Sequence, residues 1–405
     1  MDDVHRTIEV VARESYGRLV AYLSARTRDV AAAEDALNEA LLAALETWPR
    51  DGVPQKPEAW LLTTARRRLI DRARHEHTRV ASALTLQLIT EETDEAISPD
   101  KFPDERLKLL FVCAHPAIDP GIHTPLMLQS VLGLDAACIA QAFLVSPTTM
   151  GQRLVRAKAK IRDAGIAFEV PEDREMPQRL DAVLDAIYAA YGSGWEDASG
   201  IDPRRCGLAN EAIRLARLLV QQMPEEPEAR GLLALMLHCE ARRPARRTPD
   251  GRYVPLSKQD VRQWSALMIE EAEQALAAAA KQAHPGRFQT EAAIQSVHAE
   301  RAHSGRTDWH AITFFYAGLV QLAPTLGARI GHAAAVAEVN GPEQGLALLN
   351  AIELAVVAAY QPYWAVRAHL LKKLGHEAEA SEAFDRAIGL SEDGAVRQFL
   401  LEQRG

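Results

Sequence analysis

Two helical segments separated by a short break constrain most strongly what this chain can fold into. Apolar residues recur at helical spacing along the first segment, at Leu37, Leu41, Leu45 and Trp48. This spacing predicts an amphipathic helix with one buried face. Residues 49–57 are rich in proline and glycine and predict a loop, and residues 58–74 then predict a second helix.

The composition extends the helical prediction to the whole chain. Ala, Leu, Glu and Arg are abundant, β-branched runs are scarce, and aromatic residues make up only 6% of the sequence. Residues of this kind favour helices over strands. We therefore expect an all-α fold, and 405 residues are enough for two or three domains that each bury a core.

Loss of helical periodicity divides the chain into four parts. The first part, residues 1–75, is helical, and residues 76–103 form an acidic linker without periodicity. Residues 104–165 then predict four helices, broken at proline or glycine positions. Residues 172–405 predict a long helical extension, in which residues 364–388 fit the tetratricopeptide pattern.

Residues 133–160 predict two helices joined by a tight turn. Ser146 is a good N-cap and Pro147 a good first residue for the second helix. Leu154, Val155 and Ala157 are expected to pack this helix back onto the first one. The polar residues expected to face solvent are Thr148, Thr149, Gln152, Arg153, Arg156 and Lys160. This arrangement is typical of a helix-turn-helix, whose second helix enters the major groove of DNA.

The net charge of −9 conceals two basic segments. Residues 66–79 contain six arginines against two acids, and residues 146–162 contain five Lys or Arg and no acid. Binding of nucleic acid depends on local basic surfaces rather than on the charge of the whole chain. Both segments are therefore candidates for contact with DNA phosphates.

Several functional classes lack the residues that they require. The four cysteines form no C-x-x-C pair, and Cys113 near His115 is too small a set for a metal site. No phosphate-binding glycine loop or G-x-S-x-G motif is present, which disfavours an ATPase or a hydrolase. No signal peptide or apolar run of membrane-spanning length is visible. We expect a cytoplasmic protein that is not an enzyme and uses no metal or cofactor.

In order and spacing, these motifs resemble bacterial RNA polymerase sigma factors of the extracytoplasmic-function group. Residues 34–39 (EDALNE) are similar to the segment that binds core polymerase, and residues 57–74 (PEAWLLTTARRRLIDRAR) to the helix that melts and binds the minus-ten element. Residues 106–162 are similar to the domain that binds the minus-thirty-five element. Residues 113–116 (CAHP), residues 168–171 (FEVP) and the long tail resemble the subgroup with a C-terminal tetratricopeptide-like extension.

The resemblance implies three binding surfaces. The β′ clamp of core RNA polymerase would contact Glu34, Asp35, Asn38 and Glu39. The minus-ten element would contact Trp60, Arg66, Arg67, Arg68, Asp71 and Arg74. The minus-thirty-five element would contact Thr148, Thr149, Gln152, Arg153, Arg156 and Lys160. Two positions depart from the family pattern, because Asn38 stands where Gln is usual and Arg67 where Asn is common.

The extension is expected to act on the rest of the chain. Past residue 166 the sequence holds 32 acids against 25 bases, an excess that suits contact with the two basic segments. We expect the extension to regulate access to polymerase or promoter DNA in cis. Whether it activates or inhibits is not encoded in these patterns.

Two other functions are compatible with parts of the sequence. A stand-alone helix-turn-helix regulator would bind duplex DNA without polymerase, but it would leave the acidic helix and the Trp60 segment without a role. A helical-repeat scaffold for protein partners would use only the extension. Co-purification with core polymerase distinguishes the first alternative, and the salt dependence of DNA binding distinguishes the second.

Overall fold

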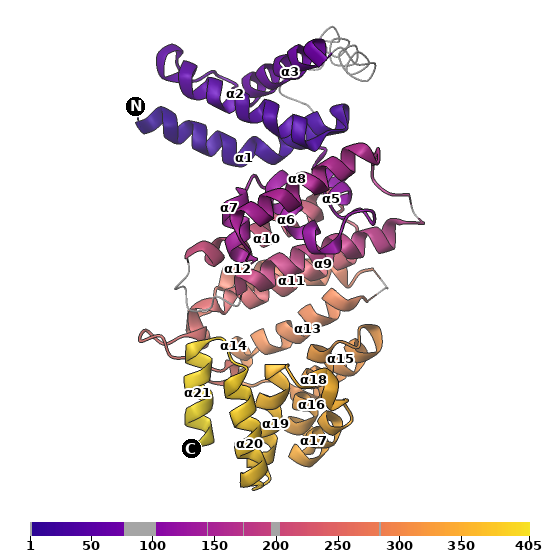
Figure 1. Cartoon of the computed structure of the whole chain (residues 1–405). Coiled ribbons are helices and arrows are strands. Elements are labelled where there is room, and N and C mark those ends of the chain that lie inside the picture. The colour runs from indigo at the N-terminus through magenta and orange to yellow at the C-terminus, as the bar shows by residue number, and fades with distance from the viewer. Residues whose placement is uncertain (1, 77–102, 144, 173, 196–202, 283–284) are drawn as a thin grey trace. The chain divides into compact units, whose positions relative to one another are not determined.

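The structure, a computed structural model, describes the whole chain except residues 1, 77–102, 144, 173, 196–202 and 283–284. The described residues form helices and connecting turns, with one isolated bridge between Arg247 and Tyr253, so the predicted all-α fold is confirmed. The chain divides into two compact units (Figure 1). Unit 1 holds residues 1–196 and 202–215, and unit 2 holds residues 197–201 and 216–405.

Unit 1 begins with three helices that pack on one another: α1 (Asp2–Thr27), α2 (Val30–Asp51) and α3 (Pro57–Glu76). Asp29 caps α2 by accepting a hydrogen bond from the Ala32 amide at 3.0 Å. The helix continues through Pro49, further than predicted, and is capped by Gly52. Gly52 has a φ of 86°, a conformation that glycine adopts readily and other residues rarely do.

The buried face of α2 differs in part from the prediction. Leu37 and Trp48 are buried as expected, whereas Leu45 is 40% exposed. Alanines complete the face instead, at Ala33, Ala36, Ala40 and Ala44. Small side chains let the neighbouring helices approach α2 closely. The prediction considered only the large apolar residues, and it therefore placed the centre of the buried face wrongly.

Four helices follow within unit 1, as predicted: α5 (Arg106–Cys113), α6 (Pro120–Ser130), α7 (Ala136–Ala142) and α8 (Pro147–Asp163). Ser146 caps α8 by accepting a hydrogen bond from the Thr149 amide at 3.1 Å, and Pro147 is its first residue. Leu154 and Ala157 are buried as predicted, but Val155 is 68% exposed. At about 100° per residue, Val155 lies a quarter turn from Leu154 and away from the core.

The next helix, α9 (Met176–Trp195), packs on α5 and α6. Leu180, Val183, Leu184 and Ile187 form its buried face. The Arg179 guanidinium donates a 2.7 Å hydrogen bond to the Phe111 carbonyl, and the Thr124 hydroxyl donates a 2.9 Å bond to the Ala186 carbonyl. Helix α9, which lies past the expected start of the extension at residue 172, therefore completes the core of unit 1 against α5 and α6. The predicted domain boundaries stay a prediction.

Helix α10 (Pro203–Gln222) contributes its first part to unit 1 and its last part to unit 2. The longer helices that follow in unit 2 are α11 (Pro227–Ala241), α12 (Ala266–Ala279), α13 (Arg287–Ala299), α15 (Trp309–Leu322), α16 (Leu326–Asn340), α17 (Pro342–Asn350), α19 (Gln361–Lys373), α20 (Glu377–Gly389) and α21 (Gly394–Arg404). The short helices are α14 (Arg301–Ser304) and α18 (Leu354–Val357), with single 3-10 turns at Arg243–Arg246, Leu256–Lys258 and Val261–Gln263.

Helices α19 and α20 form the helical hairpin that residues 364–388 predicted. Leu371, Ala380 and Phe384 are buried between them, and Gly375 turns the chain with a φ of 77°. Assignment of this hairpin to the tetratricopeptide class stays a prediction. The predicted acidic linker, residues 76–103, lies almost wholly outside the described residues. Among the helices that the structure describes, none is both long and apolar enough to cross a membrane.

Candidate polymerase and nucleic-acid interfaces

The outer face of α2 carries three of the four residues predicted to bind polymerase. Asp35, Asn38 and Glu39 are exposed, while Glu34 is buried with 7% of its surface accessible. The difference follows from the helix geometry, because Glu34 shares its side of α2 with Ala33 and Leu37. The structure therefore brings together an exposed acidic patch of Asp35, Asn38 and Glu39 and separates Glu34 from it.

Both exposed acids face arginines of α3. The Arg72 guanidinium lies 3.2 Å from the Asp35 carboxylate, and the Arg68 guanidinium lies 3.5 Å from Glu39. The four side chains are each more than half exposed. Ion pairs this exposed contribute about 0–1 kcal/mol, so they can exchange partners at little cost. A cavity of about 420 Å³ lies beside these pairs, between α2 and α3.

Helix α3 carries the residues predicted for the minus-ten element. Arg67, Arg68, Asp71 and Arg74 are exposed, and Arg74 lies 3.7 Å from Asp71 one turn away. Arg66 is only partly exposed. The exposed members form a surface of guanidinium groups in contact with solvent, which suits phosphates.

Trp60, near the start of α3, is partly buried. Its ring meets that of Trp48 edge-on, with centroids 5.5 Å apart and an interplanar angle of 71°. This is a favourable aromatic geometry that joins α2 and α3. Trp60 thus holds the two helices together, and its assignment to an unstacked DNA base stays a prediction.

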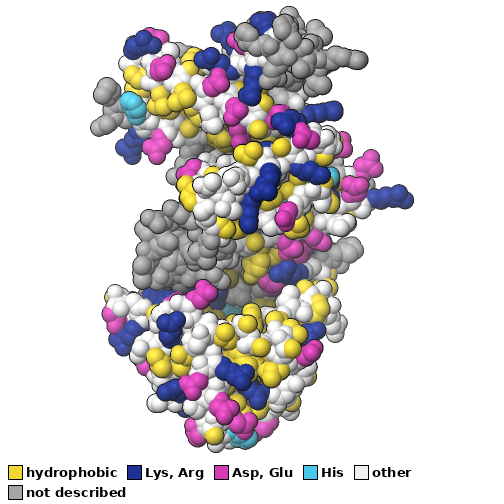
Figure 2. Space-filling view, in the orientation of Figure 1, with side chains coloured by type: hydrophobic (Ala, Val, Ile, Leu, Met, Phe, Trp, Pro, Cys, Tyr) yellow, Lys and Arg dark blue, Asp and Glu magenta, His cyan; other side chains and the backbone are white. Residues whose placement is uncertain are grey.

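Helix α8 presents the residues predicted for the minus-thirty-five element along one side. Thr148, Gln152, Arg153, Arg156 and Lys160 are exposed. Thr149 is partly buried, and its hydroxyl lies 2.7 Å from that of Ser146 at the start of the helix. Figure 2 shows Lys and Arg side chains standing out from the surface over this part of unit 1.

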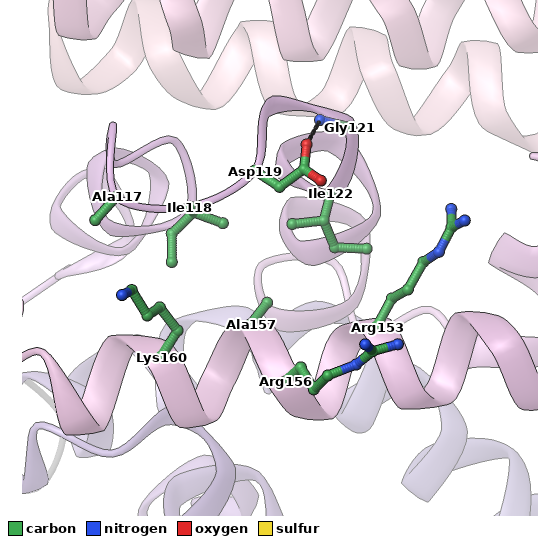
Figure 3. Close-up of a pocket in the computed structure, with 9 residues that line it drawn as sticks. All are labelled: Ala117, Ile118, Asp119, Gly121, Ile122, Arg153, Arg156, Ala157 and Lys160. Carbon is green, nitrogen blue, oxygen red and sulfur yellow. Dashed lines mark hydrogen bonds between the residues drawn. The ribbon is translucent and has the colours of Figure 1, made fainter.

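Three of these bases border a cavity of about 520 Å³ between α8 and the start of α6 (Figure 3). Arg153, Arg156 and Lys160 line it from successive turns of α8, and Ile118 and Ile122 line it from the opposite side. Asp119 also borders it, but its carboxylate accepts a 2.9 Å hydrogen bond from the Gly121 amide. Three cations spaced along one helix over an open cavity suit an anionic polymer rather than a small apolar ligand.

The other side of α8 faces α2, and sequence reasoning missed this contact. The Lys158 ammonium bonds to the Glu34 carboxylate, and the Ser130 hydroxyl donates a 2.7 Å hydrogen bond to the same carboxylate. Lys158 also donates a 2.5 Å bond to the Gln129 side chain. We call Glu34, Lys158, Gln129 and Ser130 the Glu34 cluster. Its members are separated by up to 124 residues, and no local pattern in the sequence predicts such a pairing.

The surroundings of the Glu34 cluster are largely buried. Cys113 is fully buried, and burial followed by the nearby Glu34 carboxylate raises the pKa of its thiol above the usual range. Burial and the same carboxylate also raise the pKa of the Tyr16 hydroxyl. A thiol held in its neutral form is a poor nucleophile and a poor metal ligand. In the part of the chain that the structure describes, no three His, Cys, Asp or Glu side chains gather as a metal would require.

The described part of unit 2 also has cavities. A cavity of about 510 Å³ is bordered by Tyr363, Trp364 and Arg386, and the Arg386 guanidinium lies 4.4 Å from the Trp364 ring. On the face drawn in Figure 2, apolar, basic and acidic side chains are intermixed over the described part of this unit. These features do not identify a ligand.

Parts of the chain match known protein families, and one relative matches almost the whole chain. Residues 11–79, which cover most of α1 and all of α2 and α3, match the model of sigma-70 region 2. Residues 179–280 match a family described as having unknown function, DUF6596. An uncharacterized protein of Rhizobium meliloti (strain 1021) is 38% identical over 395 residues, which is 96% of this chain and 92% of that protein. No solved structure matches the chain significantly.

Proposed function

We propose that the chain is an RNA polymerase sigma factor of the extracytoplasmic-function type. Its N-terminal helices match sigma-70 region 2, and the chain belongs to the same family as the Rhizobium relative. In this proposal α2 binds the β′ clamp of core polymerase, α3 binds and melts the minus-ten element, and α8 binds the minus-thirty-five element. The function is recognition and strand separation, without covalent chemistry.

One observation carries the proposal. The sigma-70 region 2 match falls on the helices that display an acidic patch (Asp35, Asn38 and Glu39) beside a row of exposed arginines. A polymerase-binding acidic surface and a DNA-binding basic surface would thus lie on adjacent helices. The exposed pairs between them can open when stronger partners arrive, because each contributes at most about 1 kcal/mol.

The α8 surface supports the second half of the proposal. The start of the helix carries short polar side chains that can reach base edges, at Thr148 and Gln152. The turns that follow carry Arg153, Arg156 and Lys160, which suit phosphates. A binding mode of this kind combines base discrimination with salt-dependent affinity.

A charge-reversal variant tests the polymerase contact. Replacing Asp35→Lys and Glu39→Lys together should abolish binding of the full chain to core polymerase, because both exposed acids then repel a basic partner. The matched control is Glu46→Lys with Asp51→Lys, which reverses two other exposed acids of the same helix. Wild-type affinity in the first variant would contradict the assignment of this face.

Binding experiments also separate the rival functions. A stand-alone regulator would bind duplex DNA with a steep salt dependence and would not bind core polymerase. A helical-repeat scaffold would show neither property. Binding to core polymerase together with promoter-dependent transcription is expected only of a sigma factor.

We further propose that the extension regulates the sigma domains in cis. Two observations support this: the Rhizobium relative aligns over 96% of the chain, extension included, and α9 packs directly on α5 and α6. Transcription by the full chain should therefore differ from that of a chain ending at Gln222, which keeps α9 and α10. Equal activity of the two would contradict regulation by the removed helices.

A further inference from the structure

The Glu34 cluster joins two helical groups that the proposed function keeps apart. Glu34 belongs to α2, whereas Lys158 belongs to α8, and their side chains are 10% and 8% exposed. A second pair flanks the first, with the Arg162 guanidinium 3.8 Å from the Asp29 carboxylate. An acid of the predicted polymerase-binding segment is therefore neutralised by a base of the predicted DNA-binding helix.

Two glycines allow this contact to close. A Cβ atom at Gly17 of α1 would lie 1.8 Å from the Val131 carbonyl oxygen at the end of α6. A Cβ atom at Gly133 would lie 2.8 Å from the Tyr16 ring. Separations below 3.0 Å exclude a methyl group unless the backbone shifts, so the groups α1–α3 and α5–α8 are fitted to each other around the Glu34 cluster.

This fitted arrangement is too small to bind both promoter elements at once. Elements centred at minus ten and minus thirty-five lie about 25 base pairs apart, or roughly 85 Å of duplex. A compact unit of about 210 residues is only about 45 Å across. Helices α3 and α8 both contact α2 here, so one of them must leave α2 before both elements are occupied.

We propose that the Glu34 cluster is an autoinhibitory contact, in which Lys158 holds the polymerase-binding acid Glu34 buried until core polymerase displaces it. This inference rests on the proposed function. Opening the contact exposes Glu34 to a basic surface of polymerase and frees α8 to move with its DNA element. Polymerase binding and opening are then coupled, since each favours the other.

The contact is suited to reversible opening. The free energy of a buried ion pair is only slightly lower than that of its two hydrated ions. Moving both charges into water therefore costs much less free energy than removing one partner and leaving the other buried. Residues 77–105 connect α3 to α5 along the chain, so no helix that the structure describes has to unfold for the two groups to separate.

A single methyl group provides the test. Gly17→Ala should drive α1 away from Val131 without altering any charge, while alanine by itself favours the α1 helix. Gly192→Ala is the matched control, because Gly192 also lies in a helix of unit 1 and a Cβ there meets nothing within 4 Å. Both variants are made in the full chain, and circular dichroism checks that each is folded.

Opening is measured first without polymerase, by timed alkylation of Cys113 with mass-spectrometric quantification. Every residue from Leu109 to Cys113 is buried, and α5 is covered on one side by α1. We expect Cys113 to react at least tenfold faster in Gly17→Ala than in wild type or Gly192→Ala, with the half-buried Cys138 as internal reference. Equal Cys113 rates in all three chains would overturn the closed contact itself.

Binding to core polymerase is measured second. The apparent dissociation constant rises as the competent fraction falls, so Gly17→Ala should bind roughly five- to tenfold more tightly than wild type. Lys158→Ala, which leaves every proposed polymerase residue intact, should behave in the same way. Opened variants that bind with wild-type affinity would overturn autoinhibition. If no chain binds polymerase although Cys113 becomes reactive, the proposed function fails while the contact stands.

Discussion

Arg156 is the residue of α8 at which the proposed DNA contact can be tested most simply. It is exposed, borders the α8 cavity and donates a 3.3 Å hydrogen bond to the Gln152 carbonyl, which holds its guanidinium along the helix. Replacing Arg156→Ala should weaken binding to all duplexes and reduce the salt slope by about 0.9, the loss of one phosphate contact. The measurement is a titration of promoter duplex at several salt concentrations.

The control for that titration is the neighbouring residue Val155, which is exposed and uncharged. Val155→Ala should leave both affinity and salt slope unchanged. If Arg156→Ala has the wild-type slope, its guanidinium does not neutralise a phosphate.

His298 is expected to make the stability of unit 2 depend on pH. Its burial, followed by the nearby charges of Arg242 and Arg301, lowers its pKa from 6.5 to about 4. In the unfolded chain this histidine binds a proton below about pH 6.5, whereas in the folded unit it binds one only near pH 4. The folded state therefore loses stability as the pH falls from about 6.5 to about 4. Between pH 7 and pH 5 we expect a loss of about 2 kcal/mol at this site.

Denaturant unfolding of the full chain at the two pH values tests this. His298→Phe keeps an aromatic ring beside Trp309, with which His298 makes an edge-on contact at 5.6 Å, and should flatten the pH dependence. His303→Phe is the control, since His303 is exposed. An unchanged pH dependence in His298→Phe would show that the acid sensitivity arises elsewhere.

At the scale of elements, α9 is part of the N-terminal unit although it begins the extension. Arg179→Ala removes the hydrogen bond to the Phe111 carbonyl and should destabilise unit 1 by about 1–3 kcal/mol. Arg174→Ala, at an exposed position just before the helix, should have little effect. Unfolding followed by denaturant titration makes the comparison, and equal midpoints would mean that α9 does not stabilise α5 and α6.

Local patterns predicted the helices well and their partners poorly. The start of α8 follows from Ser146 and Pro147, because capping is determined by adjacent residues. The burial of Glu34 and the docking of Arg179 depend on segments far apart in the sequence, and periodicity does not encode which helices meet. Leu45 and Val155 were misplaced for a related reason, since a stripe gives the direction of a face only to within about a quarter turn.

The candidate site shows the same division. The acids and arginines of residues 34–74 could be identified from their types and spacing, and most of them are exposed as expected. The pairing of Asp35 with Arg72 and of Glu39 with Arg68 requires the packing of α2 on α3. Trp60 contacts Trp48 in this structure, and its contact with DNA stays a prediction.

For the whole molecule, the combination of surfaces is more informative than any one of them. An acidic helix, an arginine-bearing helix and a second basic helix lie within unit 1, and the chain continues into a second helical unit. In the proposed function, the acidic patch of α2 would bind core polymerase and the two basic surfaces would bind a promoter. The Glu34 cluster would make the two events depend on each other.

In the proposed function, this chain directs core polymerase to promoters. The most direct measurement is in vitro transcription with bacterial core polymerase, the full chain and a pool of genomic fragments, followed by sequencing of the transcript starts. We predict transcripts that depend on the chain and share two motifs upstream, spaced as minus-ten and minus-thirty-five elements, and that are lost with Asp35→Lys and Glu39→Lys. Transcription no different from that of core polymerase alone would contradict the claim.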